Sequence, residues 1–188
     1  MARNKTIFKE DILRPTQQFI IEKSPNELTA RGLSKYMNIS TQPLYAEFEN
    51  MAALKRELFS QIYYKLQNEV FNKKTHDDPI INLCLNYINF ACQNPKLFRT
   101  IYLEKHGEDN HSVNEFSYNI FRTLIKDDPT YSKLPETKIN SLLTGTWVVS
   151  TGFANLIASN TIHPSQFEII SFLKDAINDV LKMEIAKS

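Results

Sequence analysis

The sequence predicts an all-α protein of about nine helices, arranged as two helical domains. Apolar residues recur at intervals of three and four along most of the chain, which is the periodicity of amphipathic helices. The chain has only four glycines, and most of its eight prolines stand where a helix would begin. With 188 residues and 42% hydrophobic content, it can bury a core. We expect an N-terminal three-helix domain over 1–50, a connecting helix over 51–72 and a second domain over 73–188.

The first helix is expected to follow a short basic arm that contains Arg3 and Lys5. Pro15 falls inside the apolar pattern of this helix, and a proline removes one backbone hydrogen bond. The helix should therefore either begin near Asp11 or bend at Pro15. Its buried face is predicted to carry Phe8, Ile12, Thr16, Phe19 and Ile20.

Residues 29–48 predict two short helices joined by a tight turn. Thr29 can cap the first helix with its hydroxyl oxygen, and Asn38 tolerates the left-handed conformation in which helices often end. Ser40 is expected to cap the second helix. Helices joined this closely are typical of the helix-turn-helix, whose second helix enters the major groove of DNA. The side chains expected to hold the two helices together are Leu33, Leu44 and Phe48.

The second helix of this motif opens with two short polar side chains, Thr41 and Gln42. The amide of Gln42 can form two hydrogen bonds with adenine, worth roughly 1–3 kcal/mol against a wrong base. We therefore expect Thr41 and Gln42 to contact base edges.

The same stretch resembles the DNA-binding motif of the TetR/AcrR transcriptional regulators, over positions 29–54 and without a gap. That motif runs Thr, apolar-Ala, Gly-Val-Ser, Leu-Tyr, Phe, Lys and Leu. The corresponding residues here are Thr29, Leu33 with Ser34, Asn38 with Ile39 and Ser40, Leu44 with Tyr45, Phe48, Met51 and Leu54. Three departures stand out: Asn38 replaces the turn glycine, Pro43 lies within the recognition helix, and Met51 replaces a lysine that lies near phosphate in the family.

The resemblance implies a homodimer that binds duplex operator DNA, which would be palindromic because a two-fold axis relates the chains. It also implies that the ring of Tyr45 packs while its hydroxyl reaches backbone phosphate. Since Met51 lacks the family's charge, other groups must supply that phosphate contact. The residues expected at phosphate are Thr29, Ser40, Tyr45 and Lys55, and Arg31 is also expected to contact DNA.

The whole chain gives little electrostatic sign of a nucleic-acid partner, because its net charge is only +1. The basic surplus is local: residues 1–45 contain seven Lys and Arg against four Asp and Glu. No apolar run resembles a leader peptide or a membrane span, so we expect a cytoplasmic protein without membrane contact.

The sequence shows no spacing typical of a catalytic or metal site. Its four histidines are scattered, and it has no Gly-rich phosphate loop and no cluster of metal ligands. Cys84 and Cys92 are expected to be buried free thiols. We therefore expect no metal, no cofactor and no enzymatic activity.

Asn50 is expected to cap the connecting helix, which would span about 20 residues or roughly 30 Å. A helix of this length can carry a displacement between domains. Beyond it, two residues that precede a proline and two capping boxes mark helix starts: Asp78-Pro79, Asn94-Pro95, Ser112 with Glu115, and Ser165 with Glu168. The predicted helices span 79–93, 95–106, 112–127, 136–159 and 165–186.

The last two helices predict a dimer interface. Over 139–157 the apolar residues point in nearly all directions, as in a helix buried on both sides. Two such helices can pair with their copies across a two-fold axis, as the resemblance also implies. The alternative is that this surface is the internal core of a monomer. The residues expected at the interface are Leu143, Val149, Phe153, Ile170, Leu173, Ile177 and Leu181.

The central helices are rich in aromatic residues, and the resemblance implies that they enclose a pocket for a small effector. For any single aromatic residue, core packing is the simpler explanation. Polar anchors are available in Arg99, His106, His111 and Asn114. The candidate pocket residues are Tyr87, Phe90, Phe98, Arg99, Tyr102, Phe116, Phe121 and Trp147.

Together these patterns lead to the hypothesis of a homodimeric transcriptional repressor. It would release its operator DNA when a small effector enters the second domain. One alternative is a helix-turn-helix regulator whose second domain binds a partner protein and no small ligand. The other is a helical enzyme, for which no catalytic spacing is found.

Overall fold

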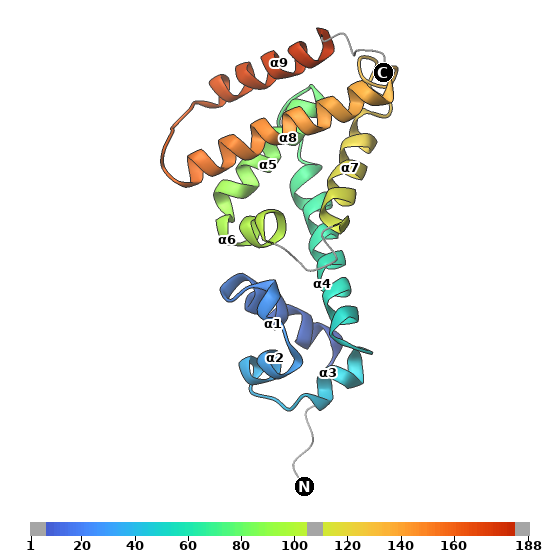
Figure 1. Cartoon of the computed structure of the whole chain (residues 1–188), viewed down its shortest axis with the longest axis vertical. Coiled ribbons are helices and arrows are strands. Elements are labelled where there is room, and N and C mark those ends of the chain that lie inside the picture. The colour runs from blue at the N-terminus through green and yellow to red at the C-terminus, as the bar shows by residue number, and fades with distance from the viewer. Residues whose placement is uncertain (1–6, 105–110, 183–188) are drawn as a thin grey trace. The chain divides into compact units, whose positions relative to one another are not determined.

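The computed structural model describes residues 7–104 and 111–182, and every element within these residues is helical (Figure 1). The predicted all-α class of about nine helices is confirmed. The α-helices of the described part are α1 (Lys9–Glu22), α2 (Ala30–Met37), α3 (Gln42–Glu47), α4 (Met51–Lys65), α5 (Pro79–Gln93), α6 (Pro95–Phe98), α7 (His111–Ile125), α8 (Glu136–Ala158) and α9 (Gln166–Lys182). Three shorter elements join them: the 3-10 helix η1 (Pro25–Glu27) and the π-helices η2 (Leu66–Phe71) and η3 (Arg99–Leu103).

The chain forms two compact units. In the described part, unit 1 contains residues 7–65 and 96–104, and unit 2 contains residues 66–95 and 111–182. These units differ from the expected domain ranges in two places. The change of unit falls inside the predicted connecting helix, where α4 gives way to the π-helix η2. In addition, residues 96–104, expected in the second domain, belong to unit 1.

Unit 1 is built on four helices that each bury one apolar side. Ile12 of α1, Leu33 of α2, Leu44 of α3 and Leu54 of α4 are at most 1% exposed. Helix α1 begins at Lys9, earlier than the expected start near Asp11, and continues through Pro15. The predicted buried face of α1 is confirmed except at its first residue, Phe8, whose side chain is 61% exposed.

The turn chemistry of the two short helices is confirmed at two of the three predicted positions. The Thr29 hydroxyl oxygen accepts the backbone N–H of Gly32 at 3.0 Å, and Asn38 lies in the left-handed region with φ 55°. The predicted cap at Ser40 is wrong. Helix α3 begins one residue later, behind Thr41, and no side-chain oxygen caps it. Pro43 in the first turn of α3 costs no helical bond, because the first amides have no partner within the helix.

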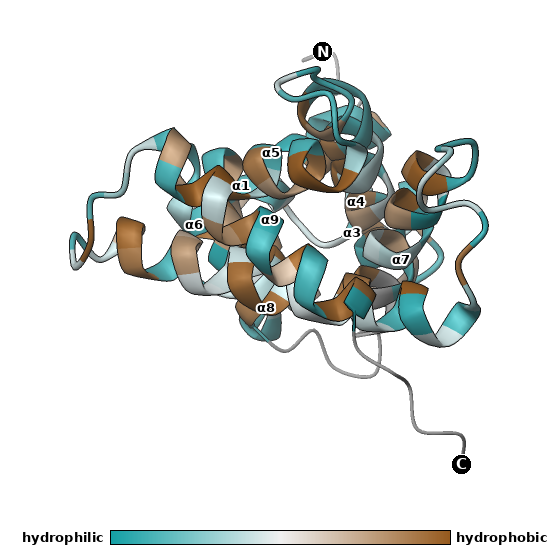
Figure 2. Ribbon diagram, turned by 90° about the horizontal axis from the view of Figure 1, so that it is seen from above, coloured by the Kyte–Doolittle hydropathy of each residue, from teal (hydrophilic) through white to brown (hydrophobic). Residues whose placement is uncertain are grey.

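Unit 2 is held together by α5, α8 and α9, which pack against one another. Its core contains Leu85 of α5, Phe121 of α7, Leu142 of α8 and Leu173 of α9, each at most 2% exposed. Figure 2 shows hydrophobic residues along much of α5 and α8. The apolar helix α8 also passes a length-and-composition test for a membrane span, with a mean hydropathy of 1.2. Only 22% of this apolar window is buried, and with its buried side α8 packs against α5 and α9 in the core of unit 2.

The start of α5 is confirmed at its predicted residue. The Asp78 carboxylate accepts the N–H groups of Ile80 and Ile81 at 2.9 and 3.0 Å, and Pro79 is the first helical residue. The same carboxylate also accepts a 2.6 Å hydrogen bond from the hydroxyl of Tyr131, which is 3% exposed. Burial, followed by this contact, raises the pKa of Tyr131 above its ordinary value. Asp78 therefore joins the start of α5 to the turn before α8.

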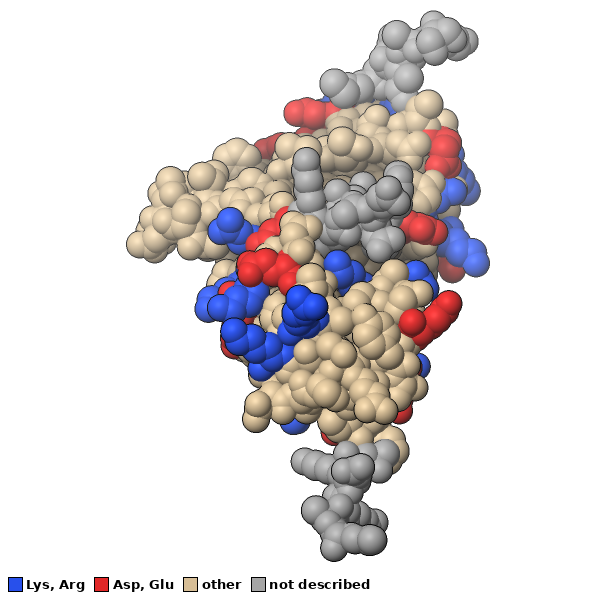
Figure 3. All heavy atoms as spheres, turned by 60° about the horizontal axis from the view of Figure 1, so that its bottom comes forward, with Lys and Arg blue, Asp and Glu red and all other residues tan. Residues whose placement is uncertain are grey.

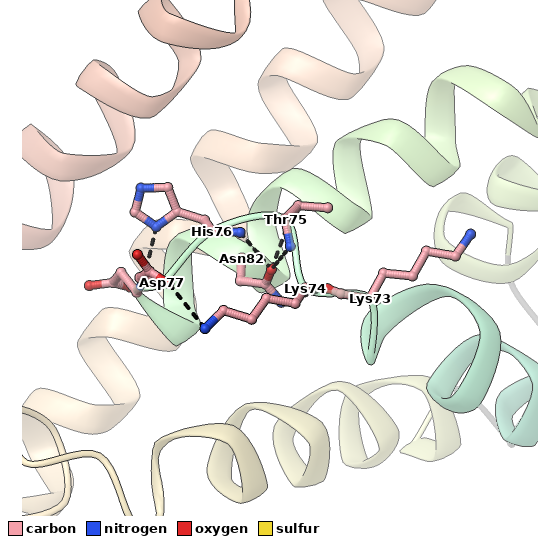
Figure 4. Close-up of polar contacts among 7 residues, drawn as sticks. Lys73, Lys74, Thr75, His76, Asp77 and Asn82 are labelled. Carbon is pink, nitrogen blue, oxygen red and sulfur yellow. Dashed lines mark hydrogen bonds and ion pairs between the residues drawn. The ribbon is translucent and has the colours of Figure 1, made fainter.

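Two buried amide side chains of α5, Asn82 and Asn86, hold the loop that precedes this helix. Figure 4 shows the contacts of Asn82. The side-chain oxygen of Asn82 accepts the N–H groups of Thr75 and His76, at 2.6 and 3.0 Å. The side-chain nitrogens of Asn82 and Asn86 both donate to the carbonyl of Lys73. These bonds hold the loop on α5 and give partners to its backbone groups.

The remaining predicted starts have mixed outcomes. The capping box at Ser165 is confirmed, since Ser165 N–H donates to Glu168 and Glu168 N–H donates back to the Ser165 hydroxyl. The predicted helix start at Pro95 is confirmed, and Asn94 also ends α5. The predicted range of 95–106 is wrong, because α6 has only four residues before the π-helix η3. The side chain of Ser112, expected to cap α7, lies outside the described residues. Both cysteines are free, as expected, but only Cys84 is buried, so the prediction of burial is wrong for Cys92.

Candidate nucleic-acid interface

The helix-turn-helix is rigid because both of its helices are anchored in the core of unit 1. Leu33 of α2 and Leu44 of α3 are fully buried, and Phe48 ends α3 with 6% of its surface exposed. The left-handed Asn38 turns the chain sharply enough for only four residues to separate α2 from α3. These local features hold α3 in a fixed orientation on unit 1.

The outward side of α3 is a narrow, uncharged strip. Gln42, Tyr45 and Ala46 are all exposed, Tyr45 by 55%. At about 100° of rotation per residue, these three positions share an arc of roughly 100° on the side away from the buried Leu44. Pro43 and Glu47, at the flanks, are half-buried. We call Gln42, Tyr45 and Ala46 the α3 strip.

The residues predicted to contact DNA all lie in unit 1. Two of them, Thr41 and Lys55, are half-buried. The other five are exposed on α2, the turn and α3: Thr29, Arg31, Ser40, Gln42 and Tyr45. The structure thus leaves most of this set accessible to a partner.

Three residues of this region were not singled out by the sequence. Ala46 became a candidate only when the structure showed it to be exposed on α3, because an alanine in a sequence does not indicate a binding role. Lys9 lies with its ammonium 5.4 Å from the centre of the Phe48 ring, so it joins the start of α1 to the end of α3. Arg56 is exposed on α4, beside the half-buried Lys55, and adds a cation near the motif.

A side-chain hydrogen bond joins α2 to α1, and a second one orients the same carboxylate. Tyr36 donates its hydroxyl to the Glu22 carboxylate at 3.1 Å, and Gln18 donates to the same carboxylate at 2.7 Å. These two hydrogen bonds, that of Gln18 first, lower the pKa of Glu22 below its ordinary value. The Tyr36 ring also meets Phe19 edge-on at 5.4 Å. Helix α2 is therefore fixed by polar and aromatic contacts in addition to its core.

Unit 1 is close to electrically neutral. Its described residues contain ten Lys and Arg against eight Asp and Glu. On the face drawn in Figure 3, one group of Lys and Arg side chains has acidic side chains among it, and other Lys and Arg side chains are scattered. Attraction to a polyanion must therefore come from a few local cations and not from the charge of the whole unit.

Unit 2 contains a polar cluster between α5 and α8, in which Tyr87 is buried and Trp147 and Thr151 are half-buried. Trp147 donates its indole N–H to the Tyr87 hydroxyl at 3.3 Å, and this hydroxyl lies 3.1 Å from the Thr151 hydroxyl. Burial is the first cause that raises the pKa of Tyr87, so the phenol stays neutral. We call Tyr87, Trp147 and Thr151 the Tyr87 cluster; Thr151 was not among the predicted residues.

The other pocket candidates divide between the two units. Phe121 is 1% exposed in the core of unit 2, which is the packing role that the sequence left open. Phe90 is buried and Phe116 half-buried in unit 2, with Phe116 6.3 Å from the Phe71 ring. Three candidates belong to unit 1: Phe98 and Tyr102, whose rings lie 5.3 Å apart, and Arg99, which pairs with Glu104 at 3.6 Å.

The predicted interface residues also separate into two groups. Leu173 and Ile177 are 0% and 3% exposed inside unit 2, so they hold α9 on the core and are not retained as interface residues. Half-buried residues that pack against that core form the second group: Leu143, Val149, Phe153, Ile170 and Leu181. The large exposed apolar side chains of α8 and α9 are instead Val148, Leu156, Phe167 and Phe172.

Some predicted positions lie outside the described residues, namely Arg3, Lys5, His106 and the side chains of His111 and Asn114. Among the residues that are described, no group of three or more His, Cys, Asp or Glu is placed to hold a metal ion.

The fold and the anchored motif define a two-unit, all-helical protein with a helix-turn-helix. The sequence matches no protein-family model and no curated protein. The fold, however, is that of the TetR-type regulators, as solved structures show. A TetR family transcription regulator from Marinobacter aquaeolei VT8 has a TM-score of 0.63 and 12% identity, over 90% of this chain and 93% of the other.

Two further structures share the fold. A protein described as a TetR family transcriptional regulator from Vibrio parahaemolyticus has a TM-score of 0.68 and 14% identity, over 90% of this chain and 96% of its own. The fatty acid degradation regulator FadR from Bacillus halodurans has a TM-score of 0.61 and 14% identity, over 97% of both chains.

Proposed function

We propose that this protein is a transcriptional regulator that binds duplex DNA through α2 and α3 of unit 1. The observation that carries the proposal is the α3 strip, a narrow polar face on a short helix whose opposite side is locked in the core. The major groove admits one helix and presents hydrogen-bond donors and acceptors at its base edges. The exposed amide of Gln42 and hydroxyl of Tyr45 match that partner in chemistry. The fold shared with known regulators supports the same function.

The division of roles within the motif follows from exposure and chemistry. Gln42, at the centre of the strip, and Thr41 contact bases. Tyr45, at one edge of the strip, places its hydroxyl on backbone phosphate, together with Thr29, Arg31, Ser40 and Lys55. The Thr29 oxygen already accepts the Gly32 N–H, but its own O–H is still available to donate to a phosphate oxygen.

The protein acts as a homodimer through the exposed apolar surface of α8 and α9. Val148 and Phe172 are 67% and 62% exposed, an unusual exposure for large apolar residues on two neighbouring helices. Gly152, between Val148 and Leu156 on α8, has open space around its Cα, so a second helix can approach closely there. A two-fold dimer gives each half of a palindromic operator its own recognition helix.

An effector binds in unit 2 and releases the DNA, so that the protein is a repressor. The Tyr87 cluster supports this proposal, because it gathers three neutral polar groups, one buried and two half-buried, beside the apolar residues of unit 2, as in many small-molecule sites. The second candidate, a partner protein in place of an effector, is favoured by the exposed Phe167 and Phe172 of α9. The two candidates differ in the place of binding. An effector would bind beside Trp147, and a partner protein would bind on the surface of α9.

The test of DNA binding compares two variants on a selected duplex and on a scrambled one. Gln42→Ala should lower the preference for the selected duplex by roughly 5- to 100-fold while leaving the scrambled one almost unchanged. Tyr45→Phe should weaken both duplexes equally, because a phosphate contact carries no sequence information. Equal loss on both duplexes for both variants would refute the division of roles. No binding of the unchanged protein to any duplex at low salt would refute the function.

The effector is tested through the single tryptophan of the chain. Because Trp147 belongs to the Tyr87 cluster, a ligand that enters unit 2 there should change its fluorescence and weaken binding to the selected duplex over the same concentration range. Tyr87→Phe, which removes the hydroxyl that accepts from Trp147, is the matched variant. A compound that releases DNA without any change at Trp147 would place the effector elsewhere.

A further inference from the structure

We propose that α3 contacts A·T base pairs and makes no guanine contact, with Gln42 on an adenine and the methyl group of Ala46 on a thymine methyl. This inference rests on the proposed function, namely that unit 1 places α3 in the major groove. It goes further because it assigns a base-pair type to the recognition helix and names Ala46 as a specificity residue.

The first argument is the composition of the α3 strip. Gln42 offers one donor and one acceptor on a short amide, which match N7 and the N6 amino group of adenine. Ala46 offers only a methyl group, and the major-groove feature that an alanine recognises is the C5 methyl of thymine. Tyr45 supplies the third side chain of the strip and lies on the other side of Gln42. The two residues of α3 that face bases, Gln42 and Ala46, therefore both favour A·T pairs. Thr41 precedes α3 and can contact either kind of pair.

The second argument is spacing. Gln42 and Ala46 are one turn apart on α3, which separates them by about 6 Å along the helix axis. Base pairs in duplex DNA rise by about 3.4 Å. The adenine met by Gln42 and the thymine met by Ala46 are therefore at most about two base pairs apart, and they form one short A·T block.

The third argument is the position of the cations. Guanine is recognised most often by Arg or Lys, through O6 and N7. Residues 36–54, which include the turn, α3 and the start of α4, contain no Lys or Arg. Among neighbouring cations, Lys9 lies over the Phe48 ring, at the end of α3. Arg31 and Lys35 stand on α2, and Lys55 and Arg56 stand on α4. These cations flank the strip, where phosphates run, and none lies on it.

The acidic residues near the strip strengthen the same conclusion. Glu47 is half-buried at the flank of α3, and Glu49 is exposed just beyond its end. A carboxylate repels the acceptor edge of guanine. It can accept from the amino group of adenine or of cytosine, and only cytosine places the acceptor-rich guanine beside it. The surroundings of the strip thus disfavour G·C pairs at the positions that α3 faces.

The experiment uses the full chain and modified bases. Duplexes are first selected from a random pool, and single bases of the enriched duplex are then replaced. Deaza-adenine lacks the N7 acceptor, uracil lacks the thymine methyl, and deaza-guanine lacks the guanine N7. We expect one deaza-adenine position to weaken binding about 3- to 10-fold. A neighbouring uracil should weaken it about 2- to 4-fold. Deaza-guanine should have no effect at any position that α3 contacts.

Variants then assign each effect to a side chain. Gln42→Ala should lose the sensitivity to deaza-adenine and keep the sensitivity to uracil. Ala46→Gly should do the reverse. Each comparison is a ratio of two duplexes measured with one variant, so a general loss of helix stability in Ala46→Gly cancels. Glu49→Gln is the matched control, because Glu49 lies outside the strip. This variant should keep both sensitivities and should change the affinity for every duplex by the same factor.

Failure of this inference can be told apart from failure of the proposed function. If no duplex is enriched from the pool, DNA binding itself is refuted, and the base assignment with it. If a duplex is enriched but deaza-guanine weakens binding and Gln42→Ala removes that effect, only the base assignment is overturned. Enrichment with no response to deaza-adenine or uracil overturns it as well.

Discussion

Unit 1 and unit 2 each expose a face that is unusual for a solitary globular protein, and the two faces are opposite in chemistry. The α3 strip is polar and uncharged, on a helix of six residues. The α8 and α9 surface is apolar, on helices of 23 and 17 residues. Val148, Leu156, Phe167 and Phe172 remain between 43% and 79% exposed there.

The difference indicates two kinds of partner. A short polar strip buries too little apolar area to bind tightly. Its hydrogen bonds therefore supply the specificity of binding, and phosphate contacts supply the affinity. A long apolar surface has little hydrogen-bond specificity, but its burial against a copy of itself releases ordered water. The comparison therefore predicts that specificity is located in unit 1 and assembly in unit 2.

The largest effect is expected when the inward side of α9 is truncated. Leu173 is fully buried, so Leu173→Ala should lower the free energy of unfolding of unit 2 by about 2–5 kcal/mol. Lys174→Ala, at an exposed position of the same helix outside the apolar surface, should cost less than about 0.5 kcal/mol. Denaturant unfolding followed at Trp147, at a fixed protein concentration, makes the measurement. Equal costs for the two variants would remove the distinction between the two sides of α9.

The next effect concerns assembly. Val148→Asp places a charge on the exposed face of α8 without touching the core, so the fold should survive while the dimer dissociates. Loss of the second recognition helix should lower the affinity for a palindromic duplex about 100-fold or more. Sedimentation and DNA titration measure the two consequences. Asn119→Asp adds the same charge on an exposed position of α7 and should leave both unchanged.

A smaller effect is expected at the Asp78 contact in unit 2. Tyr131→Phe removes a hydroxyl that donates to the carboxylate at 2.6 Å, and should lower the stability of unit 2 by about 1–2 kcal/mol. Because the pKa of Tyr131 is raised in the fold, its contribution is complete below the ordinary pKa of 10.0 and is lost as the pH rises beyond it. Unfolding at pH 7 and above pH 10 should show the difference between the variants shrinking. A difference that grows with pH would contradict the contact.

The smallest effect is at the start of α9. The Ser165 backbone N–H and then its hydroxyl lower the pKa of Glu168 below the ordinary 4.5. The stabilisation is therefore present above that pH and is lost as the pH falls through the lowered pKa. Ser165→Ala removes one of the two bonds and should raise the pKa of Glu168. An NMR titration of the carboxylate would contradict the capping box if Glu168 titrated at or above 4.5 in the unchanged protein.

Much of the local structure could be predicted from the sequence, because caps depend on neighbouring residues. Thr29, Asn38, Asp78 and Ser165 act where expected, since each bonds with backbone only two to four residues away. Ser40 failed as a cap because the adjacent Thr41 satisfies the same sequence pattern, and the pattern cannot choose between them. Helix bounds followed from the caps, and α5 has the predicted range of 79–93.

The features that were missed depend on contacts between distant residues. Periodicity placed Leu173 and Ile177 on a buried stripe, but it cannot tell whether a stripe packs within one chain or between two chains. The π-helical register of η2 and η3 has no compositional signature. Residues 96–104 were assigned by chain order, whereas their packing places them in unit 1, where the Ser24 hydroxyl donates to Glu104 at 3.2 Å. Ala46 became a candidate only when its exposure was known.

The most direct measurement is the mass of the complex between the full chain and a selected duplex, determined by sedimentation at equilibrium. The account predicts two chains on each palindromic duplex, and a much weaker complex when one half-site is scrambled. It also predicts that Gln42→Ala keeps the two-chain complex but accepts scrambled half-sites more readily. A single chain that binds a half-site as tightly as the whole palindrome, or no preference for any duplex, would contradict the assignment of specificity to unit 1 and assembly to unit 2.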